Sequence, residues 1–179
     1  MSTEAPPRQV EGTVAFTDIV GFTEYTATEG DEDALALLSL QERIVLAALP
    51  AGSRIVKELG DGLLLWFPEC DAALATCLRL QDEFEAESER TFLPLWVRIG
   101  MHWGRQTTRR DDLVGHDVNL ASRIVGVAGP GEVLLSDVTV ARISGSRDDS
   151  RFEEIGPVVM KGIPDPVRLF RAVRPHWSS

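Results

Sequence analysis

The stretch Val10–Thr23, VEGTVAFTDIVGFT, decides the fold prediction because it places a carboxylate at the end of an apolar run. Val10–Phe16 is predicted to be a buried strand, and Asp18 follows at its end. The residues from Ile19 to Thr23 then form a glycine turn that leads into a helix. The free N–H groups of such a turn bind phosphate oxygens, and a neighbouring aspartate can hold a metal that bridges to them. Taken alone, the motif is more often a simple turn or cap.

A second carboxylate, Asp61, lies in the turn Leu59–Gly62 between two apolar runs, Ser53–Lys57 and Leu63–Phe67. This composition predicts a β-hairpin, in which Asp-Gly is common for conformational reasons alone. If the hairpin lies beside the first strand, Asp61 and Asp18 become neighbours. Two close carboxylates repel one another unless a cation lies between them, and oxygen-rich sites favour Mg²⁺ or Mn²⁺. Two such ions ~3.5–4 Å apart would clamp the attacking and leaving oxygens of a phosphoryl displacement.

A third segment, Asp112–Arg123 (DLVGHDVNLASR), enters a helix predicted over Gly115–Val127. Asn119 and Arg123 are four residues apart and therefore share one face of that helix. An amide that can orient a ribose and a guanidinium that can stabilise charge on a phosphate suit phosphoryl chemistry. The alternative is an ordinary helix with a capping asparagine and an exposed arginine.

The remaining periodicity predicts an α+β sandwich, in which helices cover a mostly antiparallel sheet. The other predicted helices are Asp31–Leu49 (capped by Asp31), Asp71–Glu87 and Ser136–Ile143 (capped by Ser136). The other predicted strands are Leu95–Gly104, Glu132–Leu135, Phe152–Ile155 and Val167–Val173. We expect a disordered lead over residues 1–9, one domain over residues 10–173 and a frayed tail over residues 174–179.

Composition narrows the function classes. The chain has 179 residues, is 44% hydrophobic and carries a net charge of −10, which suits one globular domain and argues against a nucleic-acid partner. No apolar run is long enough for a membrane span, and the opening residues do not resemble a signal peptide, so we expect a cytoplasmic protein. Cys70 and Cys77 are expected to be reduced thiols rather than a disulfide or a metal knuckle.

Four motifs, taken in order, resemble those of the class III adenylate and guanylate cyclase catalytic domains. Phe16–Thr23 resembles the family's first metal motif. Val56–Gly62 (VKELGDG) resembles the hairpin with a purine-selecting residue and the second metal aspartate. Asp112–Arg123 resembles the segment with the second purine contact and the transition-state asparagine and arginine. Met160–Gly162 (MKG) with Pro166–Phe170 (PVRLF) is similar to the closing strand.

The resemblance implies two divalent metal ions, Mg²⁺ or Mn²⁺, held by Asp18, Asp61 and the main-chain carbonyl of Ile19. It also implies that Lys57 and Asp112 read the base. Adenine offers an acceptor at N1 and a donor at its amine, which a lysine donor and an aspartate acceptor match. Guanine reverses this pattern, and guanylate cyclases typically carry Glu and Cys at these positions. The sequence therefore predicts ATP as the substrate.

Further roles follow from the same resemblance. Asn119 would orient the ribose, Arg123 would stabilise the reacting phosphate, and the turn residues would bind phosphate oxygens; these are Gly21, Phe22 and Thr23. Arg105, which follows the predicted strand end at Gly104, and Lys161 match positions that hold the β- and γ-phosphates. The family usually has a longer, glycine-rich hairpin after this strand. Because the hairpin here is short and basic, Arg109 or Arg110 is an alternative to Arg105.

The fold implied by the resemblance is a ferredoxin-like α+β sandwich, and two copies would pack head to tail as a homodimer with active sites in the shared cleft. One subunit would supply the metal aspartates, and the other would supply the base-reading and transition-state residues. The implied enzyme is an adenylate cyclase, a phosphorus–oxygen lyase. Its ribose 3′-hydroxyl would attack the α-phosphate to form 3′,5′-cyclic AMP and pyrophosphate, and the metal would lower the hydroxyl's pKa.

Three alternatives stay open at this point: a guanylate or dual-specificity cyclase, a non-catalytic nucleotide-binding dimerisation module, and a ferredoxin-like interaction domain with accidental motifs. Modules of the second kind usually lose a metal aspartate, the asparagine or the arginine, and all of these are present here. His102 and Trp103 are expected to pack within a strand, and His116 and Asp117 to lie at the start of a helix, none of them with a catalytic role.

Overall fold

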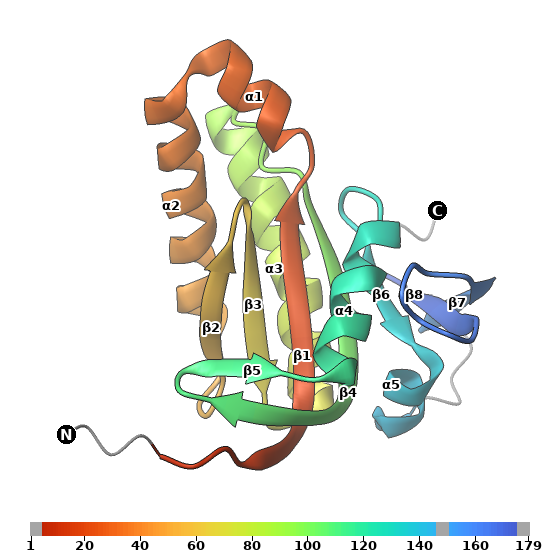
Figure 1. The fold of residues 1–179 in the computed structure, drawn as a ribbon. Coiled ribbons are helices and arrows are strands. Elements are labelled where there is room, and N and C mark those ends of the chain that lie inside the picture. The colour runs from red at the N-terminus through yellow and green to blue at the C-terminus, as the bar shows by residue number, and fades with distance from the viewer. Residues whose placement is uncertain (1–4, 146–150, 175–179) are drawn as a thin grey trace.

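One twisted sheet runs through the computed structural model, which describes residues 5–145 and 151–174 (Figure 1). The strand order is β2-β3-β1-β4-β6-β8-β7, with β5 paired to β4, and every described pairing except the parallel β4–β6 pair is antiparallel. The strands are β1 (Gln9–Ile19), β2 (Arg54–Leu59), β3 (Gly62–Phe67), β4 (Val97–Arg109), β5 (Asp112–Val114), β6 (Val133–Ser136), β7 (Phe152–Val158) and β8 (Val167–Ala172). The helices are α1 (Phe22–Glu29), α2 (Asp31–Ala48), α3 (Cys70–Thr91), α4 (His116–Val127) and α5 (Asp137–Arg142).

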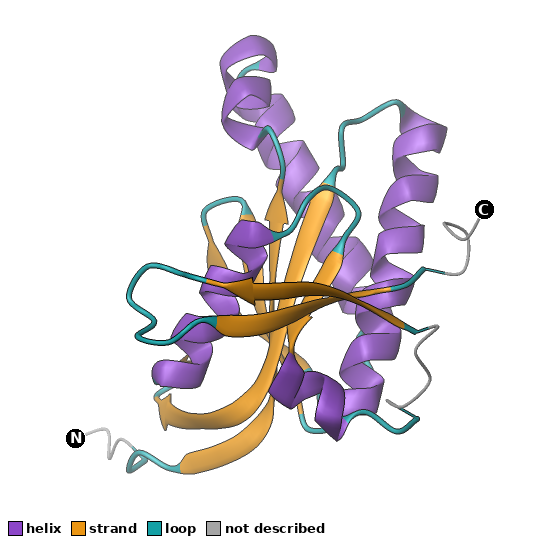
Figure 2. Ribbon diagram, turned by 90° about the vertical axis from the view of Figure 1, so that its right-hand side faces the viewer, coloured by secondary structure: helices purple, strands orange, loops and turns teal. Residues whose placement is uncertain are grey.

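The helices lie on both faces of the sheet (Figure 2). Helices α2 and α3 cover one face, and α4 covers the other (Figure 1). In the first half of the chain, from β1 to β4, the elements follow one another along the sequence as β-α-β-β-α-β, the succession found in ferredoxin-like folds. Their strands lie side by side in the spatial order β2-β3-β1-β4. The α+β sandwich with a mostly antiparallel sheet is therefore confirmed.

Alternation along β4 separates two sets of contacts, because successive side chains of a strand point to opposite faces. The residues in the core beneath α2 and α3 include Val97, Ile99, Met101 and Trp103. The intervening residues meet α4, and they are Arg98, Gly100, His102 and Gly104. A Cβ on Gly100 would lie 2.3 Å from the Val125 nitrogen, and one on Gly104 would lie 2.1 Å from an Asp117 oxygen. Helix α4 therefore sits too close to the sheet for any larger residue at these two glycines.

Most predicted elements differ from the structure by a few residues at their ends; β1 continues to Ile19, α3 to Thr91 and β7 to Val158. Two further differences concern the surroundings of the site. Strand β4 does not end at Gly104 but continues to Arg109, because its second half pairs with the start of β1 and with β5. Asp31 is not the cap of α2. Gly30 occupies the cap position with φ 91°, a conformation that favours glycine, and Asp31 is the first helical residue. Ser136 does cap α5, because its side chain accepts a hydrogen bond from the Thr139 nitrogen, as predicted.

The ordered part of the domain also extends beyond the boundaries expected at both ends. Gln9 belongs to β1, and Arg8 donates its N–H to Thr108 Oγ1 at 3.0 Å. Arg174, assigned above to the tail, is 3% exposed and pairs with Asp82 and Glu85 of α3. Residues 1–4 and 175–179 of the predicted lead and tail lie outside the described residues.

Cys70 and Cys77 are buried, and the structure shows both as free thiols. Burial raises the pKa of the Cys77 thiol to about 12, with a smaller contribution from Cys70. None of the helices within the described residues has the length and apolarity that a membrane crossing requires.

Candidate active site

The structure brings Asp18 and Asp61 together at one end of β1. Asp18 is paired in register with Gly62, and Asp61 lies in the turn just before that glycine. Burial raises the pKa of Asp61, a hydrogen bond between the two carboxyl groups and the charge of Asp18 raise it further, and it reaches about 6. The two acids therefore repel one another when both are ionised, and a cation bound between them would offset that repulsion.

A buried glutamine holds this hairpin turn in place, and sequence reasoning missed it. Gln41 on α2 is 1% exposed, accepts a hydrogen bond from Thr17 Oγ1 at 2.9 Å and donates to the Asp61 carbonyl at 3.2 Å. Gly62 is equally constrained, because a Cβ there would lie 2.1 Å from the Thr17 carbonyl oxygen. The only signal in the sequence was a polar residue on the apolar face of a helix.

An arginine that sequence reasoning also missed binds the first carboxylate. Arg98, directly opposite Asp18 across β1 and β4, donates from Nε at 2.8 Å and from Nη2 at 2.6 Å to Asp18 Oδ2. Its Nη1 donates at 3.3 Å to the Gly126 carbonyl in the last turn of α4. A charged residue within the apolar run that surrounds Arg98 was the available signal.

The donor set at this end of β1 fits hard divalent cations. It offers the carboxylate oxygens of Asp18 and Asp61, and Ile19, whose main-chain carbonyl is the third predicted ligand, directly follows Asp18. Mg²⁺ prefers six oxygen ligands and usually keeps several positions for water or substrate phosphate. No group of three or more His, Cys, Asp or Glu side chains gathers among the described residues, so ions bound here would take their remaining ligands from substrate and water.

The phosphate-binding turn predicted next to the carboxylates has the expected form. Gly21 caps α1 with φ 75°, in the left-handed region that favours glycine. Phe22 begins the helix and packs partly against the core, whereas Thr23 is exposed. The first N–H groups of a helix have no partner within the helix, so this turn can donate to phosphate oxygens.

The two predicted base-reading residues also meet in the folded chain. Lys57 on β2 places Nζ 2.9 Å from both carboxylate oxygens of Asp112 on β5. Burial alone would raise the pKa of Asp112, but hydrogen bonds from Lys57 and the Leu113 N–H outweigh it, and the pKa lies below its usual value. The pair lines an open depression of about 470 Å³ together with Arg109 and Arg110. The structure thus groups these two arginines with the base-reading pair.

Asn119 and Arg123 lie on the exposed side of α4. The side of the helix that packs on the sheet carries Val118, Ala121 and Val125. Asp18 points to the same face of the sheet as Val14 and Phe16, which are buried beneath α4. The outer side of α4 faces the opposite way, away from this part of the sheet. Asn119 and Arg123 therefore point away from the sheet that carries the carboxylates of their own chain.

Arg105 lies apart from the carboxylate pair along the chain's own sheet. Arg105 sits within β4 and forms an exposed ion pair with Glu11 at 2.9 Å. Glu11 and Asp18 are seven residues apart on β1, which is roughly 23 Å of strand. Lys161 is exposed in the connection between β7 and β8.

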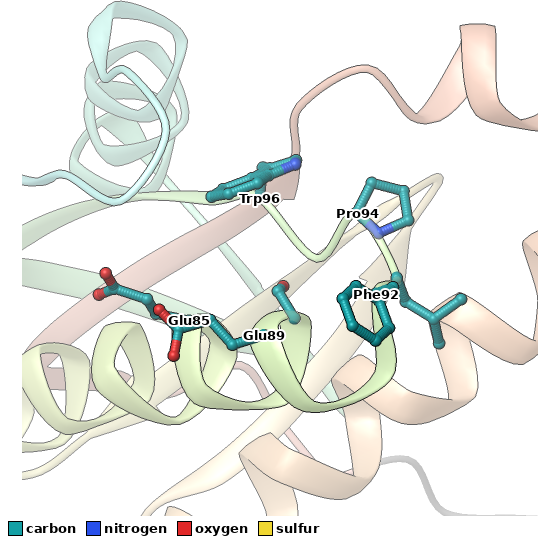
Figure 3. A pocket seen from close by; sticks show the side chains of 7 residues that line it. Glu85, Glu89, Phe92, Pro94 and Trp96 are labelled. Carbon is teal, nitrogen blue, oxygen red and sulfur yellow. The ribbon is translucent and has the colours of Figure 1, made fainter.

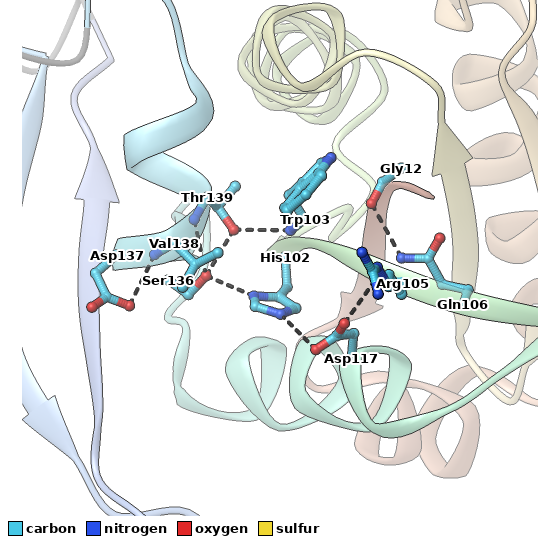
Figure 4. A network of polar contacts seen from close by, with 10 residues as sticks. All are labelled: Gly12, His102, Trp103, Arg105, Gln106, Asp117, Ser136, Asp137, Val138 and Thr139. Carbon is cyan, nitrogen blue, oxygen red and sulfur yellow. Dashed lines mark hydrogen bonds and ion pairs between the residues drawn. The ribbon is translucent and has the colours of Figure 1, made fainter. Parts of the chain in front are cut away.

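A buried polar network anchors the start of α4 (Figure 4). His102 Nε2 lies 3.1 Å from Asp117 Oδ1, and His102 Nδ1 lies 2.7 Å from Ser136 Oγ, which in turn lies 2.7 Å from Thr139 Oγ1. The Arg105 N–H donates to the other Asp117 oxygen at 2.7 Å. Ser136 is fully buried and His102 is 3% exposed, so this Ser–His–Asp series has no access to substrate. Its contacts join α4 to β4 and β6.

His102 should make the stability of the fold sensitive to acid. Burial lowers its pKa below the ordinary 6.5, although the Asp117 carboxylate opposes this. The fold then favours neutral His102, so its contribution to stability is complete above pH ~6.5 and is lost as the pH falls below that value. We expect His102→Gln to lower the melting temperature at pH 8, because it breaks a buried hydrogen-bond network, and the difference from wild type to shrink towards pH 5.5.

Thermal melts of both proteins over this pH range test the expectation. His116→Gln is the control, because His116 is exposed at the start of the same helix and should leave the melting temperature unchanged. A difference between wild type and His102→Gln that stays constant with pH would contradict the assignment.

A separate hollow of about 480 Å³ lies between the end of α3 and the start of β4 (Figure 3). Phe92, Pro94 and Trp96 form its apolar wall, and Glu85 and Glu89 contribute carboxylates. None of the predicted site residues lines it. Size alone therefore does not identify the site, and the polar groups gathered on β1, β2, β5 and α4 are the better guide.

Comparisons with known proteins identify the family of the chain. A family model described as the adenylate and guanylate cyclase catalytic domain matches residues 5–172. A pH-sensitive adenylate cyclase of Mycobacterium tuberculosis is 32% identical over 169 residues, which cover 93% of this chain and 41% of that protein. An adenylate cyclase of Streptomyces coelicolor is 31% identical, with 92% of this chain and 44% of that protein covered. The chain thus spans less than half the length of these relatives.

Solved structures lead to the same family. The adenylyl cyclase CyaB from P. aeruginosa matches with a TM-score of 0.80 at 26% identity, covering 94% of this chain and 96% of that one. The guanylyl cyclase Cya2, at 21% identity and a TM-score of 0.77 over 97% of this chain and 98% of that one, shares the fold. Because the family model matches nearly the whole chain, the protein belongs to the adenylate and guanylate cyclase catalytic domain family.

Proposed function

We propose that this domain is an adenylate cyclase that converts ATP to 3′,5′-cyclic AMP and pyrophosphate. The observation that carries the choice of ATP is the contact between Lys57 and Asp112, which lie 55 residues apart and meet at 2.9 Å. A lysine donor beside an aspartate acceptor matches N1 and the amine of adenine. Guanine would need the opposite arrangement, so the pair favours ATP over GTP.

Asp18, Asp61 and the carbonyl of Ile19 would hold two divalent ions, Mg²⁺ or Mn²⁺. When bound, such ions lower the pKa of the ribose 3′-hydroxyl and neutralise charge on the phosphates. The two carboxylates lie at the end of β1, where they would hold the ions, and the turn at the start of α1 has N–H groups that would donate to phosphate oxygens. The closeness of the turn to both carboxylates supports a phosphate site next to the proposed ions.

The remaining roles concern geometry and charge in the transition state. Asn119 would orient the ribose so that its 3′-oxygen faces the α-phosphate, and Arg123 would stabilise the charge that develops there. Lys161 and Arg105, with Arg109 or Arg110 as the alternative to Arg105, would bind the β- and γ-phosphates and so hold the departing pyrophosphate. These assignments rest on the match to the family's motifs and on the exposure of all four side chains.

A homodimer with shared sites completes the proposal. Asn119 and Arg123 face away from the sheet that carries Asp18 and Asp61 of the same chain. We therefore infer that they act together with the metal-binding aspartates of a second copy of the chain. A head-to-tail pair would then contain two equivalent sites, since one chain carries every role.

The direct test of the proposed function is the formation of cyclic AMP from ATP with Mg²⁺ or Mn²⁺, compared with the formation of cyclic GMP from GTP. We expect the double substitution Lys57→Glu and Asp112→Cys to lower kcat/KM for ATP by about a hundredfold or more, because hydrogen-bonding groups at the base would be left unpaired. GTP turnover is expected to lose much less.

A matched control is available on α3. Arg79 and Glu83 form another basic–acidic pair, at 3.6 Å, and both side chains are largely exposed. Arg79→Glu with Glu83→Cys makes the same chemical change away from the depression and should leave the preference for ATP intact. An undiminished ATP preference in the Lys57 and Asp112 double variant would remove the pair from base selection.

A further inference from the structure

We propose that Arg98 is the counter-cation of the proposed metal site. Its guanidinium pairs with the Asp18 carboxylate when no metal is bound, and a divalent ion must compete with Arg98 for that carboxylate. The inference deepens the proposed function, because it rests on Asp18 as a metal ligand. It concerns a residue outside the motifs from which the site was predicted.

The first argument is the geometry of the contact. Both Arg98 Nε and Nη2 donate to the same oxygen of Asp18, Oδ2, at 2.8 and 2.6 Å. The two N–H groups belong to one guanidinium, so they approach Oδ2 from the same side and cover that side of the oxygen. A metal ion that binds Oδ2 must therefore compete with this guanidinium, whereas Oδ1 accepts neither of these two hydrogen bonds and is the more open oxygen.

The second argument is charge. Asp18 and Asp61 are adjacent acids, and the Arg98 guanidinium contacts Asp18 directly and acts on Asp61 through its charge. The exposed fractions of the Arg98 and Asp18 side chains are 30% and 23%, so water screens the pair less than it screens a fully exposed one. A fixed positive charge at this distance repels an incoming divalent ion while it offsets the repulsion between the acids.

The third argument is that Arg98 is fixed from its other side. Nη1 donates at 3.3 Å to the Gly126 carbonyl, and a cation near the last carbonyls of a helix is favoured by the helix dipole. Arg98 therefore keeps an anchor on α4 when its bonds to Asp18 are weakened. Exchange between guanidinium and metal at Asp18 needs only a small displacement of this side chain.

The experiment measures Mn²⁺ binding to the nucleotide-free full chain, by the electron paramagnetic resonance signal of free Mn²⁺ and by the Mn²⁺-dependent rise in melting temperature. We expect Arg98→Met to bind Mn²⁺ about tenfold more tightly than wild type, because a positive charge next to the site is removed. We expect the same variant to melt at a lower temperature without metal, because the two acids lose their counter-charge. Arg98→Gln is a second neutral variant with the same expectation.

Two controls separate charge from general damage. Arg98→Lys keeps the positive charge and should leave the Mn²⁺ affinity within about threefold of wild type. Arg168→Met removes a cross-strand arginine with the same bonding pattern, in which Nε and Nη2 both contact Glu154 Oε1 at 2.9 and 2.8 Å, far along the sheet between β7 and β8. It should leave Mn²⁺ binding unchanged.

The outcomes distinguish this inference from the metal site itself. If wild type binds Mn²⁺, Asp18→Asn abolishes the binding and the neutral Arg98 variants bind equally or more weakly, the counter-cation role is wrong while the metal site stands. If neither wild type nor the Arg98 variants bind Mn²⁺, both proposals are wrong. Tighter binding in the neutral variants with wild-type binding in Arg98→Lys is the supporting result.

Discussion

Asp61→Ala should reduce cyclic AMP formation by about a thousandfold or more while the protein remains folded. The two carboxylates are the acidic ligands proposed for the metal ions, and the loss of ~4 kcal/mol of transition-state stabilisation corresponds to about a thousandfold in rate. The fold should not suffer. The pKa of Asp61 is raised to about 6 from 3.8 by burial and by Asp18. Its contribution to stability therefore falls as the pH rises from about 3.8 to about 6, and the full destabilisation by the ionised form is present above that range.

Thermal melts at pH 8 complete this test. Asp61→Ala should melt at the wild-type temperature or higher without metal, and Mn²⁺ should raise the melting temperature of wild type only, because ligands stabilise the state that binds them. Asp18→Asn should also be inactive but should melt lower, since Arg98 then faces a neutral partner. Asp33→Ala, on the exposed first turn of α2, is the control for activity. Normal turnover in Asp61→Ala would disprove the metal assignment.

Mixing two inactive variants should restore activity if the sites are shared between subunits. Asp61→Ala and Arg123→Ala chains should each be inactive alone. In a heterodimer of the two, one site carries both defects and the other carries neither. Random exchange gives about half heterodimers, each with one intact site of two, so about a quarter of the wild-type activity should return. The physical reason is the outward direction of Asn119 and Arg123 on α4.

Exchange of subunits has to be demonstrated separately, with chains that carry two different tags. A mixture of Asp61→Ala with Asp18→Asn is the matched control, because both defects lie in the same half of the site. Every heterodimer of that pair has one defect in each site, and no activity should return. Tagged Asp61→Ala and Arg123→Ala heterodimers that form and stay inactive would show that each site lies within one chain.

The sequence predicted those parts of the fold and site that depend on local patterns. The strand before Asp18 and the hairpin around Asp61 are marked by apolar runs and a glycine turn, and their meeting follows from one antiparallel pairing. The contact between Lys57 and Asp112 is different. It depends on a short strand, β5, whose sequence is too short to show alternation, and the expectation that both residues read one base came from the family resemblance.

The missed features depend on tertiary pairing. The sequence of the second half of β4 is polar and predicts a loop. In the structure it is a strand, because it pairs with the start of β1. Gln41 and His102 are polar residues in buried positions, and a pattern of apolar residues says nothing about which partner satisfies them. Arg98 was hidden for the same reason, since its partner Asp18 lies 80 residues away.

The alternation on β4 limits how this domain can change in length. Four alternate residues of β4 contact α4. Arg98 donates to a helix carbonyl, Gly100 allows a close approach of the helix backbone, and His102 and Gly104 both contact Asp117. One inserted residue between positions 98 and 104 would turn every later side chain to the opposite face and set bulky residues such as Met101 against the helix. Functional insertions should therefore gather in the turns, and libraries that vary the length of this strand should yield almost no active members.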